Sequence, residues 1–166
     1  MDYKKFIRFG KEGKGDISLL LEDVGAFRQA IEEMLAPFQK ENIDKVVAIE
    51  ARGFLFGAVI ASTMNVPLAM VRKEGNLPMD VLREEVIDYT GKKKVLEIQK
   101  DAIKKGERVL VVDDWVETGS QARTAFQMIE KLGGEIAGFT VLVDNTTKDV
   151  KDFLSSYPYH CLIHID

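Results

Sequence analysis

Short runs of apolar residues recur along the chain, and stretches with a helical spacing of apolar residues separate them. Strands that are apolar at nearly every position are typical of a parallel sheet that helices cover on both faces. We therefore predict a central parallel sheet whose strands contain the runs Val46–Ile49, Val66–Val71, Val109–Val112, Phe139–Val143 and Cys161–Ile165.

The segments between these runs have the period of amphipathic helices. Residues 26–38, AFRQAIEEMLAPF, and residues 120–134, SQARTAFQMIEKLGG, place apolar side chains three or four positions apart. Gly133 and Gly134 close the second segment and predict where its helix ends. Because strands and helices alternate, we predict an α/β fold with right-handed crossovers and a Rossmann-like parallel core.

The segment 74–94, EGNLPMDVLREEVIDYTGKKK, departs from this pattern. It is charged, and its glycines and proline predict a hairpin without a strong core face. A segment this long inside a compact domain is typically a lid over a site. The alternative is a solvated two-stranded flap with no role.

Composition limits the possible functions. The chain has 166 residues, 46% hydrophobic and 30% charged, which predicts one globular domain over residues 1–166. The net charge of −4 argues against nucleic acid or an anionic membrane as partner, so an anionic ligand needs a local site. The single cysteine, Cys161, cannot form an internal disulfide, and we expect a cytoplasmic protein. We find no apolar stretch near the roughly 20 residues of a membrane span.

The run VLVVDDWVETGSQA, residues 109–122, joins a strand to a helix. Ligands of open α/β sheets bind outside the carboxyl ends of the strands, where we expect Asp113 and Asp114 just after the strand. The turn at Gly119 then opens a helix whose first N–H groups, with nearby hydroxyls, suit a phosphate. Carboxylates beside a phosphate site suit sugar hydroxyls or Mg²⁺. This pattern predicts a sugar phosphate; the alternative is that Ser120 only caps the helix and the aspartates are solvated.

Two other predicted strands also end in cationic residues. Arg52 follows the strand at 46–49, and its planar guanidinium could hold a phosphate by two hydrogen bonds. Arg72 and Lys73 follow the strand at 66–71. Together these strand ends predict a ligand with separated phosphates and a sugar between them. The alternative for Arg52 is a surface ion pair with Glu50.

Residues 109–122 resemble the phosphoribosyl-diphosphate signature of the type I phosphoribosyltransferase family. The segments AIEARGFLFGAVIA, VPLAMVRKEGNLP and VLEIQKDAIKKGERVLVVDD resemble the adenine branch of that family in the same order and at similar spacing. The resemblance covers roughly residues 16–142. It implies the parallel-sheet core of that family, with a small N-terminal hood over the base (residues 1–18) and a flexible lid (residues 74–94).

The resemblance also implies a reaction. A purine nitrogen displaces pyrophosphate from C1 of Mg²⁺-bound phosphoribosyl diphosphate and gives a nucleoside monophosphate, as in purine salvage. Adenine is the first expectation for the base, and hypoxanthine, guanine or xanthine are alternatives. A second alternative is a regulator that binds phosphoribosyl diphosphate without catalysis. The family is commonly dimeric, so we expect a homodimer.

Roles for individual residues follow from the same resemblance. Asp113 and Asp114 are expected to hold the ribose hydroxyls, with Mg²⁺ near them. The peptide between Glu50 and Ala51 matches a position that is often cis. The expected 5′-phosphate residues are Thr118, Gly119, Ser120 and Gln121, and the expected pyrophosphate residues are Ala51, Arg52, Arg72 and Lys73.

The chain departs from the family pattern at the expected catalytic positions. Glu117 stands where the adenine branch has alanine, and it is either a general base or a carboxylate favoured by the helix start. Asp88 and Tyr89 are the nearest match to the catalytic pair of the lid.

The base site differs as well. Lys14 occupies the place of a stacking phenylalanine. Phe6 and Phe9 are the alternatives for stacking, although the register does not require either, and Trp115 either flanks the base or fills the core. His160 and His164 have no metal-ligating partner near them in this interpretation, and we expect them to be structural.

Overall fold

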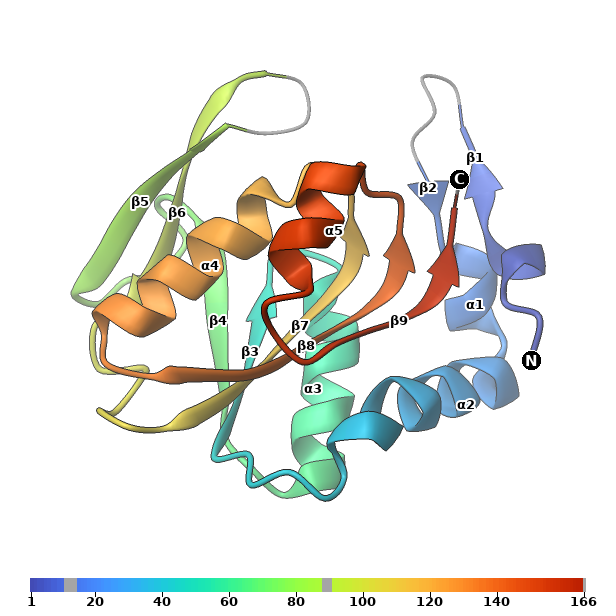
Figure 1. The fold of residues 1–166 in the computed structure, drawn as a ribbon, viewed down its shortest axis with the longest axis horizontal. Coiled ribbons are helices and arrows are strands. Elements are labelled where there is room, and N and C mark those ends of the chain that lie inside the picture. Colours follow the sequence, from blue (N-terminus) through green and yellow to red (C-terminus); the bar gives the residue numbers. More distant parts are fainter. Residues whose placement is uncertain (11–14, 88–90, 166) are drawn as a thin grey trace.

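The computed structural model describes residues 1–10, 15–87 and 91–165, and its centre is a seven-stranded sheet in the order β5-β6-β4-β3-β7-β8-β9 (Figure 1). Five adjacent strands of this sheet pair in parallel, namely β4, β3, β7, β8 and β9. The predicted α/β fold with a parallel core is therefore confirmed. The strands are β3 (Lys45–Ile49), β4 (Leu68–Lys73), β5 (Val81–Ile87), β6 (Lys93–Gln99), β7 (Arg108–Val116), β8 (Glu135–Asp144) and β9 (Tyr159–His164).

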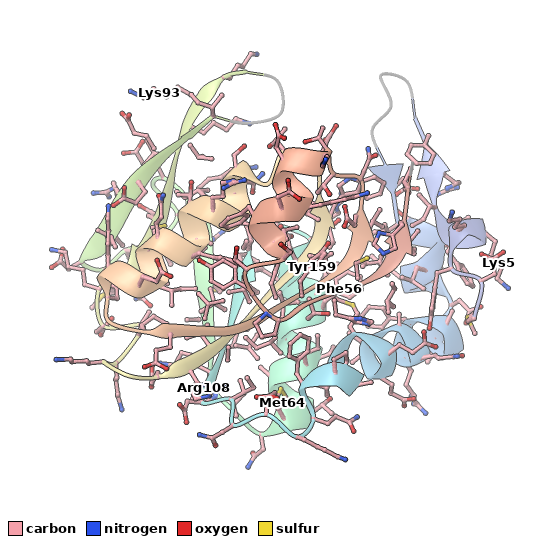
Figure 2. All side chains as sticks on the ribbon, viewed as in Figure 1. Lys5, Phe56, Met64, Lys93, Arg108 and Tyr159 are labelled. Carbon is pink, nitrogen blue, oxygen red and sulfur yellow. The ribbon has the colours of Figure 1, made fainter. Side chains whose placement is uncertain are left out.

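Helices cover both faces of the sheet and form two hydrophobic cores. The short α1 (Ser18–Glu22), α2 (Val24–Leu35), the 3₁₀ turn η3 (Ala36–Phe38) and α3 (Gly53–Met64) lie on one side, and α4 (Ser120–Lys131) and α5 (Lys148–Leu154) lie on the other. Successive side chains of β3 point into the two cores in turn: Val46 packs in the core with α2 and α3, and Val47 packs in the core with α4. Lys5 and Lys93 project outward at the rim (Figure 2). Among the described residues, no helix is long and apolar enough to cross a membrane.

The strand β7 is longer than the apolar run that predicted it. Asp113 and Asp114 were expected just after the strand, but β7 continues through both to Val116. The continuation has a partner on one side only, since β7 pairs with β8 as far as Val116 while its register with β3 runs only to Val112. The aspartates are therefore held by a strand rather than by a loop.

The segment 74–94 forms much of a hairpin that extends the sheet. β5 and β6 pair antiparallel, and β6 also pairs antiparallel with β4. The expectation of a hairpin is confirmed, but the absence of a core face is wrong. Val86 is buried on the α4 side together with Leu96 and Ile98, because α4 packs against β5 and β6.

The N-terminal residues form a small unit beside the end of β9. A 3₁₀ turn η1 (Lys4–Phe6) precedes β1 (Arg8–Phe9), which pairs antiparallel with β2 (Gly15–Asp16). Nε and Nη2 of Arg8 donate to Oδ2 of Asp16 at 3.1 and 2.6 Å and tie the two strands together. Figure 1 shows this hood and the β5–β6 hairpin rising on either side of the carboxyl ends of the central strands.

Candidate functional site

The candidate site lies where β3 and β7 end side by side and α3 begins. The pairing between β3 and β7 ends at Val112 of β7. The start of α3 therefore packs directly against the last part of β7. Gly53 makes this approach possible, since a Cβ there would lie 2.8 Å from Oδ1 of Asp113 and 3.2 Å from the carbonyl oxygen of Val112. The sequence places Gly53 in a turn between a strand and a helix, but Gly53 was not among the predicted site residues.

The two aspartates at the end of β7 are almost fully buried. Asp113 is 7% exposed and Asp114 is 5% exposed. Burial is the main cause that raises the pKa of Asp113 well above its usual value, and the neighbouring Asp114 carboxylate adds to it. Burial also raises the pKa of Asp114, although the charge of Arg52 opposes that rise. Two carboxylates held out of water in this way are costly to the fold, which is typical of a functional site.

Arg52 connects the end of β7 to the hood. Nη2 of Arg52 lies 2.8 Å from Oδ2 of Asp114, although that oxygen accepts no hydrogen bond of good geometry from the described residues, so the contact is chiefly electrostatic. Nη1 of Arg52 donates to the carbonyl oxygen of Gly15 at 2.8 Å. The alternative pairing of Arg52 with Glu50 is wrong, because Glu50 pairs with Arg72.

The loop after β7 turns sharply into α4. Gly119 caps the helix at φ 67°, and a Cβ on it would lie 2.6 Å from Cγ1 of Val150. Both the backbone angle and the contact therefore require glycine. Arg123 makes the first backbone hydrogen bond of the helix, to the carbonyl oxygen of Gly119 at 2.9 Å. The N–H groups of residues 121 and 122 are among those that a helix leaves for an outside acceptor, and the N–H of Ser120 donates to Oγ1 of Thr118 at 3.4 Å.

Hydroxyl groups lie beside this helix start. Oγ1 of Thr118 and Oγ of Ser120 are 2.6 Å apart, and the Ser120 side chain does not cap the helix. The alternative in which Ser120 serves only as the cap is therefore wrong. Gln121 is in the first turn and half-buried, and Glu117 before the loop is exposed. A phosphate placed here would meet backbone N–H groups, hydroxyls and the positive end of the α4 dipole.

The peptide between Glu50 and Ala51 is cis, as the resemblance implied. Oε2 of Glu50 accepts hydrogen bonds from Nε of Arg72 at 3.1 Å and from the backbone N–H of Lys73 at 3.0 Å. Nη1 of Arg72 also donates to the carbonyl oxygen of Asn76 at 3.0 Å. The loop after β3 and the end of β4 are thus joined, and both predicted cationic residues of β4 lie at the same sheet edge as Arg52.

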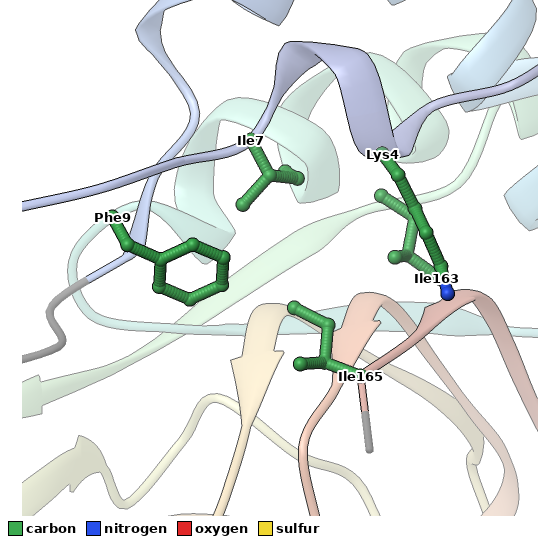
Figure 3. A pocket seen from close by; sticks show the side chains of 5 residues that line it. All are labelled: Lys4, Ile7, Phe9, Ile163 and Ile165. Atoms are coloured by element: carbon green, nitrogen blue, oxygen red, sulfur yellow. The ribbon is translucent and has the colours of Figure 1, made fainter.

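The hood reaches the strand that carries the aspartates. The rings of Phe9 and Trp115 meet edge to face, with centroids 6.1 Å apart. The backbone of Gly15 packs on the same indole, since a Cβ there would overlap the Trp115 ring. Phe9 also borders a cavity of about 320 Å³ between the hood and β9 (Figure 3). The cavity is lined by Lys4, Ile7, Phe9, Ile163 and Ile165.

The structure brings together most of the residues that the sequence analysis selected. The aspartates, Arg52 and the loop 117–121 adjoin one another, and Arg72 and Lys73 lie at the same edge two strands away. Asp88, Tyr89 and Lys14 lie outside the described residues.

Known proteins resemble this chain over its whole length. A sequence profile of the family described as phosphoribosyl transferase domain matches residues 20–162. The adenine phosphoribosyltransferase of Clostridium novyi (strain NT) is 37% identical, with 100% of this chain and 99% of that protein covered. The crystal structure of adenine phosphoribosyltransferase from Rhodothermus marinus DSM 4252 has a TM-score of 0.90 and 32% identity, with 98% and 96% covered. That of APRTase from Giardia lamblia complexed with 9-deazaadenine has a TM-score of 0.90 and 25% identity, with 99% and 97% covered.

Proposed function

The chain belongs to the phosphoribosyl transferase family, and we propose that it transfers ribose 5-phosphate from phosphoribosyl diphosphate to adenine, giving AMP and pyrophosphate. Relatives and solved structures named adenine phosphoribosyltransferase match it from end to end, which supports adenine as the base and purine salvage as the role. The observation that carries the proposal is the buried pair Asp113 and Asp114, placed directly before the glycine-capped start of α4.

The ribose 5-phosphate part of the substrate fits the end of β7 and the start of α4. Asp113 and Asp114 accept hydrogen bonds from the ribose hydroxyls, and they stabilise positive charge that develops on the sugar as the bond to pyrophosphate breaks. The 5′-phosphate binds to the backbone N–H groups at the start of α4, with Thr118 and Ser120 donating from their hydroxyls. Gln121 adds an amide donor where a hydroxyl is common in the family.

The departing pyrophosphate needs cationic partners on the other side of the sugar. Arg52 uses one N–H on Gly15 and faces Asp114 with another nitrogen, and a guanidinium has five N–H donors. The remaining donors, together with Arg72, Lys73 and the Ala51 peptide, bind the diphosphate oxygens. Binding energy collected there positions C1 of the ribose for attack.

Magnesium is expected to enter with the sugar diphosphate. The fit is supported by the carboxylate oxygens at the end of β7, since Oδ2 of Asp114 accepts no hydrogen bond of good geometry from the described residues. Hard oxygen donors are the ligands that Mg²⁺ prefers. Asp113 and Asp114 would hold the ion, which supplies charge neutralisation to the diphosphate when bound.

The purine binds between the hood and β7. Phe9 and Trp115 offer aromatic faces at this place, and Phe9 supplies the ring that is absent at Lys14 in the sequence. Glu117 is exposed beyond the end of β7 and acts as the general base toward the purine. Asp88 and Tyr89 complete the site from the lid.

The segment 74–94 acts as the lid of the site. Its hairpin is anchored by buried side chains on the α4 side, while the side chain of Ile87 near the end of β5 is 54% exposed. An anchored hairpin with an exposed end can close over bound substrate and exclude water from the reacting sugar.

We expect a homodimer in the cytoplasm. α3 and the adjoining β4 leave apolar side chains in solvent, with Leu55 45%, Val59 39% and Met70 38% exposed, as is typical of a protein interface. The unpaired thiol of Cys161 suits a reducing compartment. The mass in solution, measured by light scattering, tests the dimer, and Leu55→Glu is expected to give a monomer.

The experiment that tests the function supplies the purified protein with Mg²⁺, phosphoribosyl diphosphate and one base at a time. Adenine, hypoxanthine, guanine and xanthine form the panel, and release of pyrophosphate is measured. We expect the highest kcat/KM with adenine. Turnover with another purine alone would change the assigned base, and binding of the sugar diphosphate without turnover would favour a regulatory protein.

A further inference from the structure

Three metal-ligating side chains meet at the edge of the sheet, away from the aspartates of β7. Asp144 ends β8, and Cys161 and His164 belong to β9. The parallel register places Asp144 opposite His164. A carboxylate oxygen, the sulfur and a ring nitrogen of the three residues all lie within 4.8 Å of one another. The expectation that His164 has no metal-ligating partner near it is therefore wrong, because strand pairing brings Asp144 beside it.

The distances within the cluster match the edges of a tetrahedral metal centre. Nδ1 of His164 lies 3.4 Å from Sγ of Cys161 and 3.6 Å from Oδ2 of Asp144. Zinc bond lengths of about 2.3 Å to sulfur and about 2.0 Å to nitrogen or oxygen give tetrahedral edges of roughly 3.6 and 3.3 Å. Small side-chain movements are enough to bring the three atoms onto one ion.

Asp144 is already oriented as a ligand that binds through one oxygen. Its side chain is only 1% exposed. Oδ1 accepts hydrogen bonds from the backbone N–H of Thr146 at 2.9 Å and from its hydroxyl at 2.6 Å. Oδ2, which faces His164, accepts one from the Tyr159 hydroxyl at 2.9 Å. Outer partners of this kind fix the orientation of a metal-binding carboxylate.

We propose that Asp144, Cys161 and His164 form a zinc-binding site, with a water molecule in the fourth position. Sulfur, imidazole and carboxylate together suit Zn²⁺, whereas Mg²⁺ prefers oxygen donors alone. The His164 side chain is 62% exposed, so the ion has a path from solvent and room for the water. This site is separate from the carboxylates that bind the sugar, and it does not depend on the transfer reaction.

A reactive thiol is the competing interpretation of the same cluster. Nε2 of His164 lies 3.0 Å from Sγ of Cys161, as in a cysteine–histidine pair. Asp144 adds a third ligand atom, and the three atoms lie within 4.8 Å of one another. This convergence of three ligand types is the geometry of a metal site.

The test titrates the chelator-treated full chain with Zn²⁺ alone, in competition with a chromogenic indicator. We expect one ion per chain and an affinity that falls about tenfold or more in Cys161→Ser and in His164→Ala. His160→Gln, on the same strand but outside the cluster, and Asp113→Asn, at the sugar site, are expected to keep the affinity of the unaltered protein.

Titration of the unaltered chain with Co²⁺ adds a readout that needs no variant. A thiolate ligand gives a sulfur-to-Co²⁺ charge-transfer band in the near ultraviolet, and we expect that band at one equivalent. Lack of the band, or an unchanged Zn²⁺ affinity in both Cys161→Ser and His164→Ala, would overturn the proposal. Circular dichroism of each variant establishes that a lost affinity is not a lost fold.

Discussion

Arg52 and Asp114 form an ion pair, with Nη2 of the arginine 2.8 Å from Oδ2 of the aspartate. The pair ties the loop after β3 to the end of β7, and the same guanidinium holds the carbonyl oxygen of Gly15 in the hood. In the proposed complex, Arg52 binds the diphosphate and Asp114 binds the ribose, so the two parts of the substrate contact the two partners of one ion pair. This coupling makes Asp114 the first residue to change.

Asp114→Asn is expected to weaken the binding of phosphoribosyl diphosphate about 10- to 100-fold. The asparagine keeps the shape of the side chain but gives up charge-assisted hydrogen bonds to the ribose hydroxyls, which contribute roughly 1.5–3 kcal/mol. Equilibrium binding in the presence of Mg²⁺ measures the change. Asp101→Asn, an exposed aspartate, is the matched control. Full retention of affinity would remove Asp114 from the ribose site.

Asp113→Asn is expected to stabilise the fold while it impairs sugar binding. Removing a buried charge beside Asp114 should raise the free energy of unfolding by about 1 kcal/mol, or roughly 2–4 °C in Tm for a domain of this size. Oδ1 of the asparagine can still accept the Asp114 N–H, which Asp113 holds at 2.8 Å.

The stabilisation by Asp113→Asn is expected to depend on pH. Because the pKa of Asp113 is raised in the folded protein, its charge destabilises the fold fully above that pKa. As pH falls through the folded pKa toward the unfolded value of about 3.9, the carboxyl becomes neutral and the penalty disappears. Calorimetry should therefore find the difference in Tm shrinking at low pH, and a difference that grows there would contradict the assignment.

Gly119→Ala is expected to lower the free energy of unfolding more than a glycine-to-alanine change at another position with positive φ. The alanine would have to adopt φ 67° and place its Cβ 2.6 Å from Val150, at a total cost of about 2–4 kcal/mol. Gly106→Ala is the matched control, since φ is 81° there and nothing lies within 4 Å of the added Cβ. Urea unfolding compares the two. Adding Val150→Ala to Gly119→Ala should recover the steric part only, and equal losses in the two single variants would argue against the contact.

Glu117→Gln is expected to lower kcat by about 10²- to 10⁴-fold if the carboxylate is the general base, with little change in the binding of phosphoribosyl diphosphate. Glu117 is exposed in the structure, so the substitution should leave stability nearly unchanged. Single-turnover kinetics separates the chemical step from binding. An unchanged rate would return Glu117 to the role of a carboxylate favoured by the helix start.

The pattern of apolar residues along the sequence predicted the elements of the fold, because strands of a parallel sheet that is buried on both faces are apolar at nearly every position. The apolar run before Asp113 and the helical spacing after Gly119 both correspond to real elements. The pattern failed where burial depends on a distant element. Val86 stands among charged residues in the sequence, and it is buried because α4 packs against the hairpin.

Candidate residues were easier to predict than their partners. A strand end followed by glycine selected Asp113, Asp114 and the loop 117–121 as candidates from neighbours in the sequence. The contact of Arg52 with Asp114 depends on how closely α3 approaches β7 at Gly53, and no local pattern specifies that distance. The zinc-ligand cluster likewise arises from the pairing of β8 with β9, which joins residues 20 positions apart.

A crystal structure with ribose 5-phosphate bound tests the central claim most directly. We expect the ribose hydroxyl oxygens within about 3 Å of the Asp113 and Asp114 carboxylates, and the phosphate against the N–H groups at the start of α4 beside Gly119. A sugar phosphate bound elsewhere on the molecule would contradict the claim that these two carboxylates and this helix start together hold a phosphorylated pentose.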